Sequence, residues 1–301
     1  MLAGCQTLHL LDARVWLGIP NLLDKAMQPG IRHVVASNHL ESSAVAMSQT
    51  SFVNPMLNKV PAATLAFWVI KIMSTTVGET SADYLAVHVG LGTTVTGGIM
   101  ASLFLAALFL QLRARRYVPW IYWLTVVLVS VVGTQITDAL TDRLGISLYV
   151  STAVFAVALA ATFAAWYASE RTLSIHTIFT TKRELFYWTA ILFTFALGTA
   201  SGDLATEALG LGFQFGVVVF SALIAAITLA HYRGADAILA FWLAYILTRP
   251  LGASLGDLLS QAQTYGGMGL GTVVTSAAFL AVIIALVALL SRRAEPAADR
   301  A

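Results

Sequence analysis

The sequence predicts an all-α membrane protein: eight transmembrane helices, arranged as four helical hairpins with pseudo-symmetry about the membrane normal. Three observations predict this fold. The 301 residues are 58% hydrophobic and only 11% charged, whereas soluble domains carry about 25% charged residues. Long apolar segments follow one another beyond Pro61. Every second segment repeats one residue pattern, and such self-similarity indicates a repeat architecture.

Residues 1–58 hold scattered charges and no apolar run long enough to cross a bilayer. We expect them to form a poorly ordered N-terminal extension, and residues 294–301 to form a C-terminal tail. The single cysteine, Cys5, excludes an intrachain disulfide and a multi-cysteine metal site. The formal net charge of +2 gives no basis for a nucleic-acid partner.

Each apolar segment has about 20 residues, enough to cross a hydrocarbon core of roughly 30 Å at about 1.5 Å per residue. The expected helices lie near residues 62–86, 93–112, 118–141, 147–168, 185–208, 212–231, 236–260 and 271–291.

Eight spans leave both termini on one side of the membrane. Of the basic residues near the ends of the spans, Arg143 alone falls on the opposite side. Basic residues concentrate in cytoplasmic loops, so we expect a bacterial cytoplasmic (inner) membrane protein with both termini in the cytoplasm. The basic residues on the side of the termini are Lys59, Arg113, Arg115, Arg116, Arg171, Lys182, Arg183, Arg233, Arg292 and Arg293.

The odd-numbered segments read "FWVIKIMSTTVGETSAD", "YWLTVVLVSVVGTQITD", "YWTAILFTFALGTASGD" and "FWLAYILTRPLGASLGD". Each is an aromatic residue, Trp, nine residues, Gly, four residues and Asp. The repeated positions are Trp68, Trp123, Trp188 and Trp242; Gly78, Gly133, Gly198 and Gly252; and Asp83, Asp138, Asp203 and Asp257. A glycine-containing triplet follows each Asp, beginning at Gly90, Gly145, Gly210 and Gly269.

The pattern divides the chain into repeats at residues 59–114, 115–170, 171–232 and 233–293. Because each repeat holds two spans, all four insert the same way up. They are therefore expected to be related by axes along the membrane normal rather than by inverted topology.

In this pattern the chain resembles a family of uncharacterised bacterial multipass membrane proteins built from four tandem two-helix repeats, each with a tryptophan. The resemblance covers about residues 58–291, and all four copies keep the W-x9-G-x4-D pattern. No reaction or substrate comes with the family, so the resemblance implies the architecture and the membrane location alone.

The tryptophans are interpreted as interfacial anchors or packing residues, since Trp is enriched at membrane interfaces. The glycines are interpreted as positions of close helix approach, the usual role of small residues between membrane helices.

The aspartates lie 15 residues after each Trp, or about 22 Å along a helix, near the outer edge of the hydrocarbon. They either cap turns and face water, or converge on a common axis. Converging carboxylates recruit a cation, and rings of acidic residues select cations in channels. Glu79, one turn before Asp83, is particular to the first repeat.

Two basic residues, Lys71 and Arg249, lie inside predicted spans. Buried cations are costly and usually paired, so we expect both to be charge partners of the carboxylates. His88 lies near Asp83, and as a lone histidine it is a weak candidate for a metal ligand. Pro250 should kink its helix.

Nothing in the sequence matches a nucleotide loop, a zinc-protease motif or a nucleophile elbow, so we expect no enzyme and no cofactor. The leading hypothesis is a transporter of a small solute, first of all a cation. Oxygen ligands suit Mg²⁺ or Mn²⁺, although the metal is left open. The alternative is a non-transporting scaffold or partner-binding protein with structural acids. Convergence of three or more aspartates on one cavity would favour transport.

Overall fold

The computed structural model describes residues 58–87 and 93–294. The predicted N-terminal extension up to residue 57, the tail beyond Ala294, His88 and the triplet at Gly90 lie outside the described residues. Within them the chain forms eight α-helices and no strand, which confirms the all-α fold.

The eight helices begin and end close to the predicted limits. When the π-helical extensions of α5 and α7 are counted, every boundary lies within four residues of the expected position. The elements are α3 (Leu65–Val87), α4 (Thr93–Arg113), α5 (Pro119–Asp138) with η2 (Ala139–Arg143), α6 (Leu148–Glu170), α7 (Thr181–Asp203) with η4 (Leu204–Ala208), α8 (Gly212–Tyr232), α9 (Ala237–Ser260) and α10 (Thr272–Ala294).

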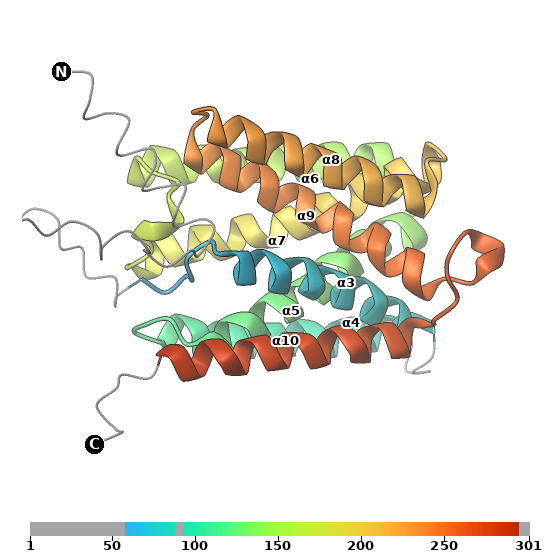
Figure 1. The fold of residues 1–301 in the computed structure, drawn as a ribbon, viewed down its shortest axis with the longest axis horizontal. Helices are drawn as coiled ribbons and strands as arrows, with labels where there is room; N and C mark the ends of the chain where they lie inside the picture. Colours follow the sequence, from blue (N-terminus) through green and yellow to red (C-terminus); the bar gives the residue numbers. More distant parts are fainter. Residues whose placement is uncertain (1–57, 88–92, 295–301) are drawn as a thin grey trace, which may run out of the picture.

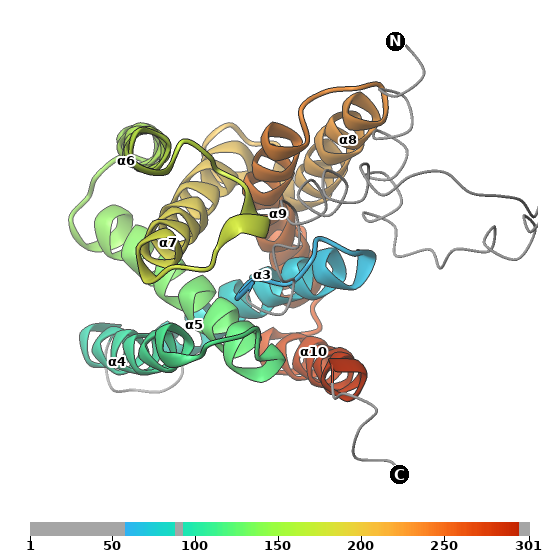
Figure 2. The ribbon, with the colours of Figure 1, turned by 90° about the vertical axis from the view of Figure 1, so that its left-hand side faces the viewer.

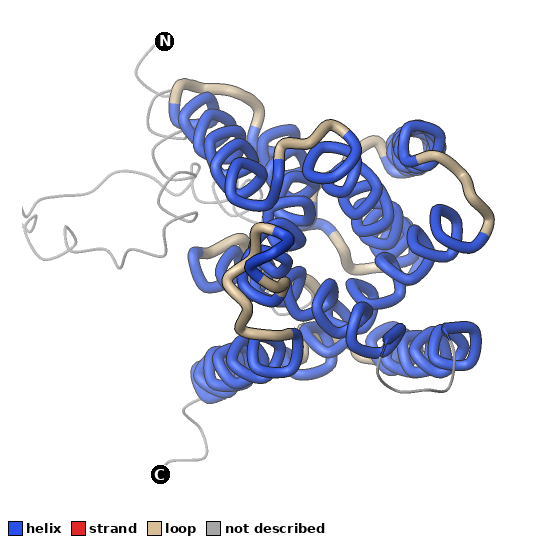
Figure 3. The backbone as a smooth tube through the Cα atoms, turned by 90° about the vertical axis from the view of Figure 1, so that its right-hand side faces the viewer, coloured by secondary structure: helices blue, strands red, loops and turns tan. Residues whose placement is uncertain are grey.

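The helices form two shells. The inner helices α3, α5, α7 and α9 form a ring in which each packs against its two neighbours, and α9 closes the ring against α3. The outer helices α4, α6, α8 and α10 lie around this ring, as the two end-on views show (Figures 2 and 3). All eight run roughly along one long axis (Figure 1).

Each outer helix packs against the inner helix of the following repeat. α4 packs on α5, α6 on α7, α8 on α9, and α10 returns to α3. The two helices of one repeat hardly touch, so the expected self-packed hairpin is not the packing unit. A single repeat cannot bury its own apolar face, and stacking on the next repeat supplies the missing surface.

The inner helices approach most closely at the repeat glycines. A Cβ atom at each glycine would overlap the residue seven positions after the Trp of the next repeat. The four contacts run around the whole ring: Gly78 to Ser130 (1.8 Å), Gly133 to Phe195 (2.6 Å), Gly198 to Arg249 (2.3 Å) and Gly252 to Thr75 (2.5 Å).

Seven of the described helices, all except α3, are long and apolar enough to cross a membrane. The outer helices expose large apolar side chains such as Leu105, Val157 and Phe215. Both features fit a multipass membrane protein. The eighth predicted span, α3, contains Lys71, Glu79 and Asp83, which lower its hydropathy. It packs between α5, α9 and α10, where neighbouring helices rather than lipid surround it.

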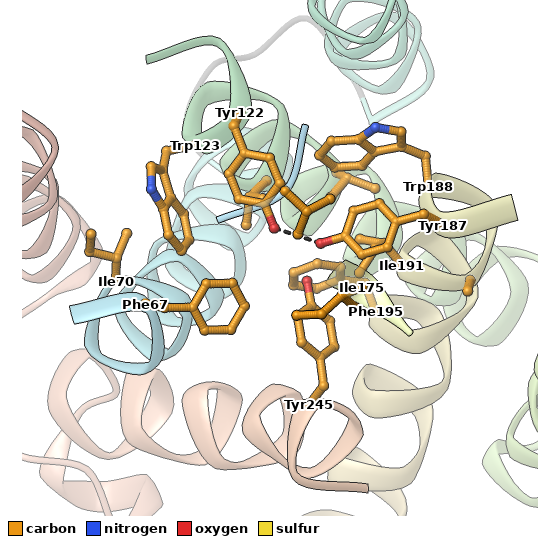
Figure 4. Close-up of a cluster of buried hydrophobic side chains, with 14 of the residues drawn as sticks. Phe67, Ile70, Tyr122, Trp123, Ile175, Tyr187, Trp188, Ile191, Phe195 and Tyr245 are labelled. Atoms are coloured by element: carbon orange, nitrogen blue, oxygen red, sulfur yellow. Dashed lines mark hydrogen bonds between the residues drawn. The ribbon is translucent and has the colours of Figure 1, made fainter. Parts of the chain in front are cut away.

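The repeated tryptophans belong to an aromatic core. Trp123, Trp188 and Trp242 are buried and Trp68 is half-buried. Figure 4 shows Phe67, Tyr122, Tyr187 and Tyr245 pointing toward one another from the four inner helices, with a hydrogen bond between the hydroxyls of Tyr122 and Tyr187. These aromatic side chains fill the space enclosed by the four inner helices, near the end at which those helices begin.

The backbone conformation explains why a glycine begins the triplet after each Asp. Its first glycine adopts a positive φ in the second, third and fourth repeats, at Gly145 (65°), Gly210 (68°) and Gly269 (78°). Only glycine enters this region without steric cost. The glycine therefore turns the chain from an inner helix into the next outer helix.

We predict that Gly133→Ala lowers the free energy of unfolding, because its Cβ would lie 2.6 Å from Cβ of Phe195 and overpacking costs about 1–3 kcal/mol. The measurement is the Tm of the purified protein in nanodiscs. Gly98→Ala is the matched control, since a Cβ at this helical glycine meets nothing within 4 Å. Equal Tm values for the two variants would contradict the close-approach account.

Candidate cation site

A cavity of about 820 Å³ opens at the end of the bundle where the inner helices finish. We call it the acid cavity. Among the described residues its lining holds a single basic side chain, Arg143, whose Nη1 donates to Thr94 Oγ1 (2.7 Å). Threonines and glutamines supply much of the remaining polar surface. The carboxylates that line it are Glu79, Asp138, Asp142, Asp203, Glu207 and Asp257.

The carboxylates differ in burial. Asp142 and Glu207 are exposed, Asp138 and Asp203 are half-buried, and Asp257 and Glu79 are only 8% and 6% exposed. The cavity therefore reaches the surface, and its acids continue from there into the protein interior.

The ends of the inner helices position these acids. Asp138 and Asp203 are the last residues of α5 and α7, and each is followed directly by a π-helical turn. Those turns, η2 and η4, carry Asp142 and Glu207. Single π-helical turns are rare and often occur at functional sites. Asp257 lies in α9, one turn before that helix ends.

The structure thus brings together four of the five predicted acids: Asp138, Asp203, Asp257 and Glu79. Asp83 lies in α3, but its side chain is outside the described part of the chain. The lining also includes two acids that are not among the predicted site residues, Asp142 and Glu207, each four residues after a repeated Asp.

Arg249 is fully buried and reaches toward Glu79, the most buried acid of the cavity lining. Its Nη2 forms an ion pair with Glu79 and donates to Thr134 Oγ1 and to Thr199 Oγ1, the latter at 2.6 Å. Glu79, Thr134 and Thr199 occupy the same position, eleven residues after the Trp, in the first three repeats. We call these three residues the floor site.

The guanidinium of Arg249 is only partly satisfied. Nη2 makes all of its contacts to the floor site, while Nε and Nη1 have no hydrogen-bond partner among the described residues. A buried donor left without a partner costs about 1–3 kcal/mol. The ion pair with Glu79 therefore has to offset two such penalties.

Lys71, the other predicted charge partner, pairs with no carboxylate of the described chain. Its Nζ lies 4.0 Å from the ring centroid of Phe195 and 4.4 Å from that of Tyr245. It has no hydrogen-bond partner among the described residues. Aromatic faces attract a cation, so Lys71 contacts the rings of Phe195 and Tyr245 where a carboxylate was expected from the sequence.

The opposite end of the bundle holds a buried polar network that sequence reasoning missed. Lys59 Nζ lies 2.7 Å from Glu184 Oε2 and donates to the carbonyl oxygen of Leu112 (3.0 Å). Gln111 Nε2 donates to the second oxygen of Glu184 (3.0 Å). In the sequence, Lys59 is one of the basic residues near the ends of the spans, and nothing in the local sequence indicates that it meets Glu184.

A second hollow of about 550 Å³ lies at this end, and Phe67 and Trp123 belong to its lining. Along α3, Phe67 and Glu79 are twelve residues apart, or about 18 Å. Between these two positions α3 carries Lys71, which is fully buried, as is Arg249.

No group of three or more His, Cys, Asp or Glu side chains in the described part of the chain is close enough to hold a metal ion. The carboxylates of the acid cavity are spread over its wall instead.

Comparison with known proteins gives one match. The profile described as Repeat of Unknown Function (DUF347) matches residues 66–117, 121–172, 186–235 and 240–295. The four tandem repeats predicted from the sequence are thereby confirmed. Neither the curated proteins nor the solved structures include a match to the chain.

We predict that Arg249→Met destabilises the protein by about 3–5 kcal/mol, because it leaves Glu79 buried without its counter-charge. The double variant Glu79→Gln/Arg249→Met should recover part of the loss. Thermal unfolding in nanodiscs measures both. Lys182→Ala is the control, because its ion pair with Glu170 is exposed and exposed pairs contribute little. A Tm for Arg249→Met equal to that of Lys182→Ala would refute the buried pair.

Proposed function

The chain belongs to the Repeat of Unknown Function (DUF347) family, and we propose that its members with this cavity are multipass membrane transporters of a small cation. The proposal is for transport and not for catalysis. The lipid bilayer and the cation are the partners that it requires.

One observation carries the proposal: three repeated aspartates and Glu79 line a single cavity. A cleft lined by one sign of charge and walled by apolar protein focuses the field and concentrates counter-ions. Of the described lining residues, six are carboxylates and one is basic, so the favoured counter-ion is a cation.

The distribution of the remaining contacts supports a transporter rather than an open channel. The acid cavity reaches the surface at one end, while the Lys59–Glu184 network and the aromatic core close the other. A carrier that alternates between two open states would present this arrangement in one of them. Opening the second hollow would require separating Lys59 from Glu184.

The proposal includes a direction. The basic residues of the chain place both termini in the cytoplasm of a bacterial inner membrane, so the acid cavity would face outward. The ring of glycine contacts supports a pseudo-symmetric arrangement of the four repeats about an axis along the membrane normal. The cation would enter along that axis.

The alternative is a scaffold in which the acids are structural. Its supporting observation is the ion pair between Arg249 and Glu79, which neutralises one acid without any ligand. The two proposals differ in what the other acids of the cavity do. In a transporter their loss reduces cation flux, whereas a scaffold carries no flux to reduce.

We predict that Asp138→Asn/Asp203→Asn/Asp257→Asn reduces cation flux into proteoliposomes by about tenfold or more, since the loss of three charges removes most of the focusing field. The assay compares a panel of monovalent, divalent and organic cations with the wild-type protein. Insertion into the vesicles is measured in parallel.

The matched control is Asp236→Asn. Asp236 is exposed at the other end of the bundle, where its carboxylate accepts a hydrogen bond from the backbone N–H of Leu239, and Asn caps helices equally well. Flux should stay at the wild-type level in this variant. Undiminished flux in the triple variant, or no cation flux in the wild type, would favour the scaffold.

A further inference from the structure

We infer that Arg249 is a tethered cation held in a ligand site, and that the ligand displacing it is an organic cation bearing a guanidinium or amine group. This inference rests on the proposed transport function and adds the class of substrate. It concerns the floor site, Glu79, Thr134 and Thr199.

The register of the repeats places this site on the inside of the ring. Glu79, Thr134 and Thr199 come from α3, α5 and α7 at one repeat position, and the fourth repeat has Ala253 there. The small Ala253 contributes no polar group. Arg249, one turn earlier in α9, supplies the cation instead and reaches all three.

The contacts are those of a guanidinium receptor. One carboxylate oxygen and two hydroxyl oxygens accept hydrogen bonds from a single nitrogen, Nη2. Charge-assisted bonds from a guanidinium to a carboxylate are among the strongest in proteins. A cationic N–H donor, from a guanidinium or an amine, is therefore what this site already holds.

Arg249 occupies the site, but not all of its own hydrogen-bond donors are satisfied. Its Nε and Nη1 remain without hydrogen-bond partners among the described residues. Arg249 is held by its backbone next to Pro250 and its stem lies against Gly198, whereas a free ligand can orient its N–H groups toward the same acceptors without that tether. A ligand of the same chemistry can therefore bind the floor site at least as well as the tethered group.

Displacement also needs a replacement charge. Glu79 is 6% exposed, and a buried carboxylate without a counter-charge is strongly unfavourable. A neutral solute would leave it unpaired, so only a cation can exchange with Arg249. This exchange would make Arg249 the residue that rejects neutral solutes.

The size of the cavity favours an organic cation over a bare metal ion. About 820 Å³ lies within the range of roughly 300–1,000 Å³ of small-molecule sites. The floor site offers one carboxylate and two hydroxyls, fewer charged ligands than a dehydrated divalent ion requires. The more exposed acids of the wall would hold a second positive group.

The test measures binding of methylguanidinium to the full-length protein in nanodiscs by calorimetry. We expect Arg249→Ala to bind it about tenfold or more tightly than the wild type, because the tethered competitor is gone. Glu79→Gln/Arg249→Ala should lose this gain, since the carboxylate is the charged acceptor. Lys182→Ala, far from the cavity and exposed, should match the wild type.

Two results would overturn the inference: methylguanidinium binding no tighter in Arg249→Ala than in the wild type, or equal binding by Arg249→Ala and the double variant. Binding of Mg²⁺ in place of methylguanidinium by Arg249→Ala would overturn the organic class while leaving cation flux intact. Undiminished flux in the triple aspartate variant, or no cation flux in the wild type, alone defines failure of the transport proposal, so the two failures are distinguishable.

Arg249→Ala can also fail to fold, and that outcome is informative. Folding restored by methylguanidinium during purification would support the inference. Arg249→Gln keeps an N–H donor and most of the side-chain volume, and a folded Arg249→Gln that binds no methylguanidinium would overturn it.

Discussion

The close approach of α3, α5, α7 and α9 at their glycines constrains the rest of the molecule. Each glycine lies against the residue seven positions after the Trp of the next repeat, and the four contacts close into a ring. No larger side chain fits at those positions without displacing a neighbour. What the ring encloses is therefore decided by the residues around the glycines: Thr75, Ser130, Phe195 and Arg249.

One of these enclosed residues is charged, and its charge organises the interior. Arg249 requires an acceptor, and the floor site supplies Glu79, Thr134 and Thr199. Because that pair is neutral as a unit, the negative character of the cavity comes from the acids nearer its mouth. The aromatic core and the Lys59–Glu184 network lie toward the other end. In the described part of the chain, the acid cavity thus opens at the end where the inner helices finish, and buried groups occupy the interior beyond it.

The sequence was enough to predict the helices, the repeats and the common depth of the aspartates, because each depends on spacing along one chain. It could not assign which helix packs on which: α4 meets α5 rather than α3, a choice made by contacts between repeats. The sequence predicts eight apolar spans, whereas seven of the described helices are apolar enough to cross a membrane. The eighth, α3, carries charged residues and packs against α5, α9 and α10. The partners of Arg249 could have been predicted from the sequence, because Glu79, Thr134 and Thr199 share one repeat position. Lys59 and Glu184 are 125 residues apart, and no local pattern joins them.

The most direct test of the central claim, that the acid cavity is reachable and attracts cations, is the rate of cysteine modification inside it. Thr141 lines the cavity, and Cys5 is the one native cysteine. Thr141→Cys in a Cys5→Ser background should react about tenfold or more faster with a cationic methanethiosulfonate than with an anionic one of similar size. Asparagine at Asp138, Asp203 and Asp257 should remove most of that preference. Equal rates for the two reagents, or faster reaction with the anion, would contradict the account.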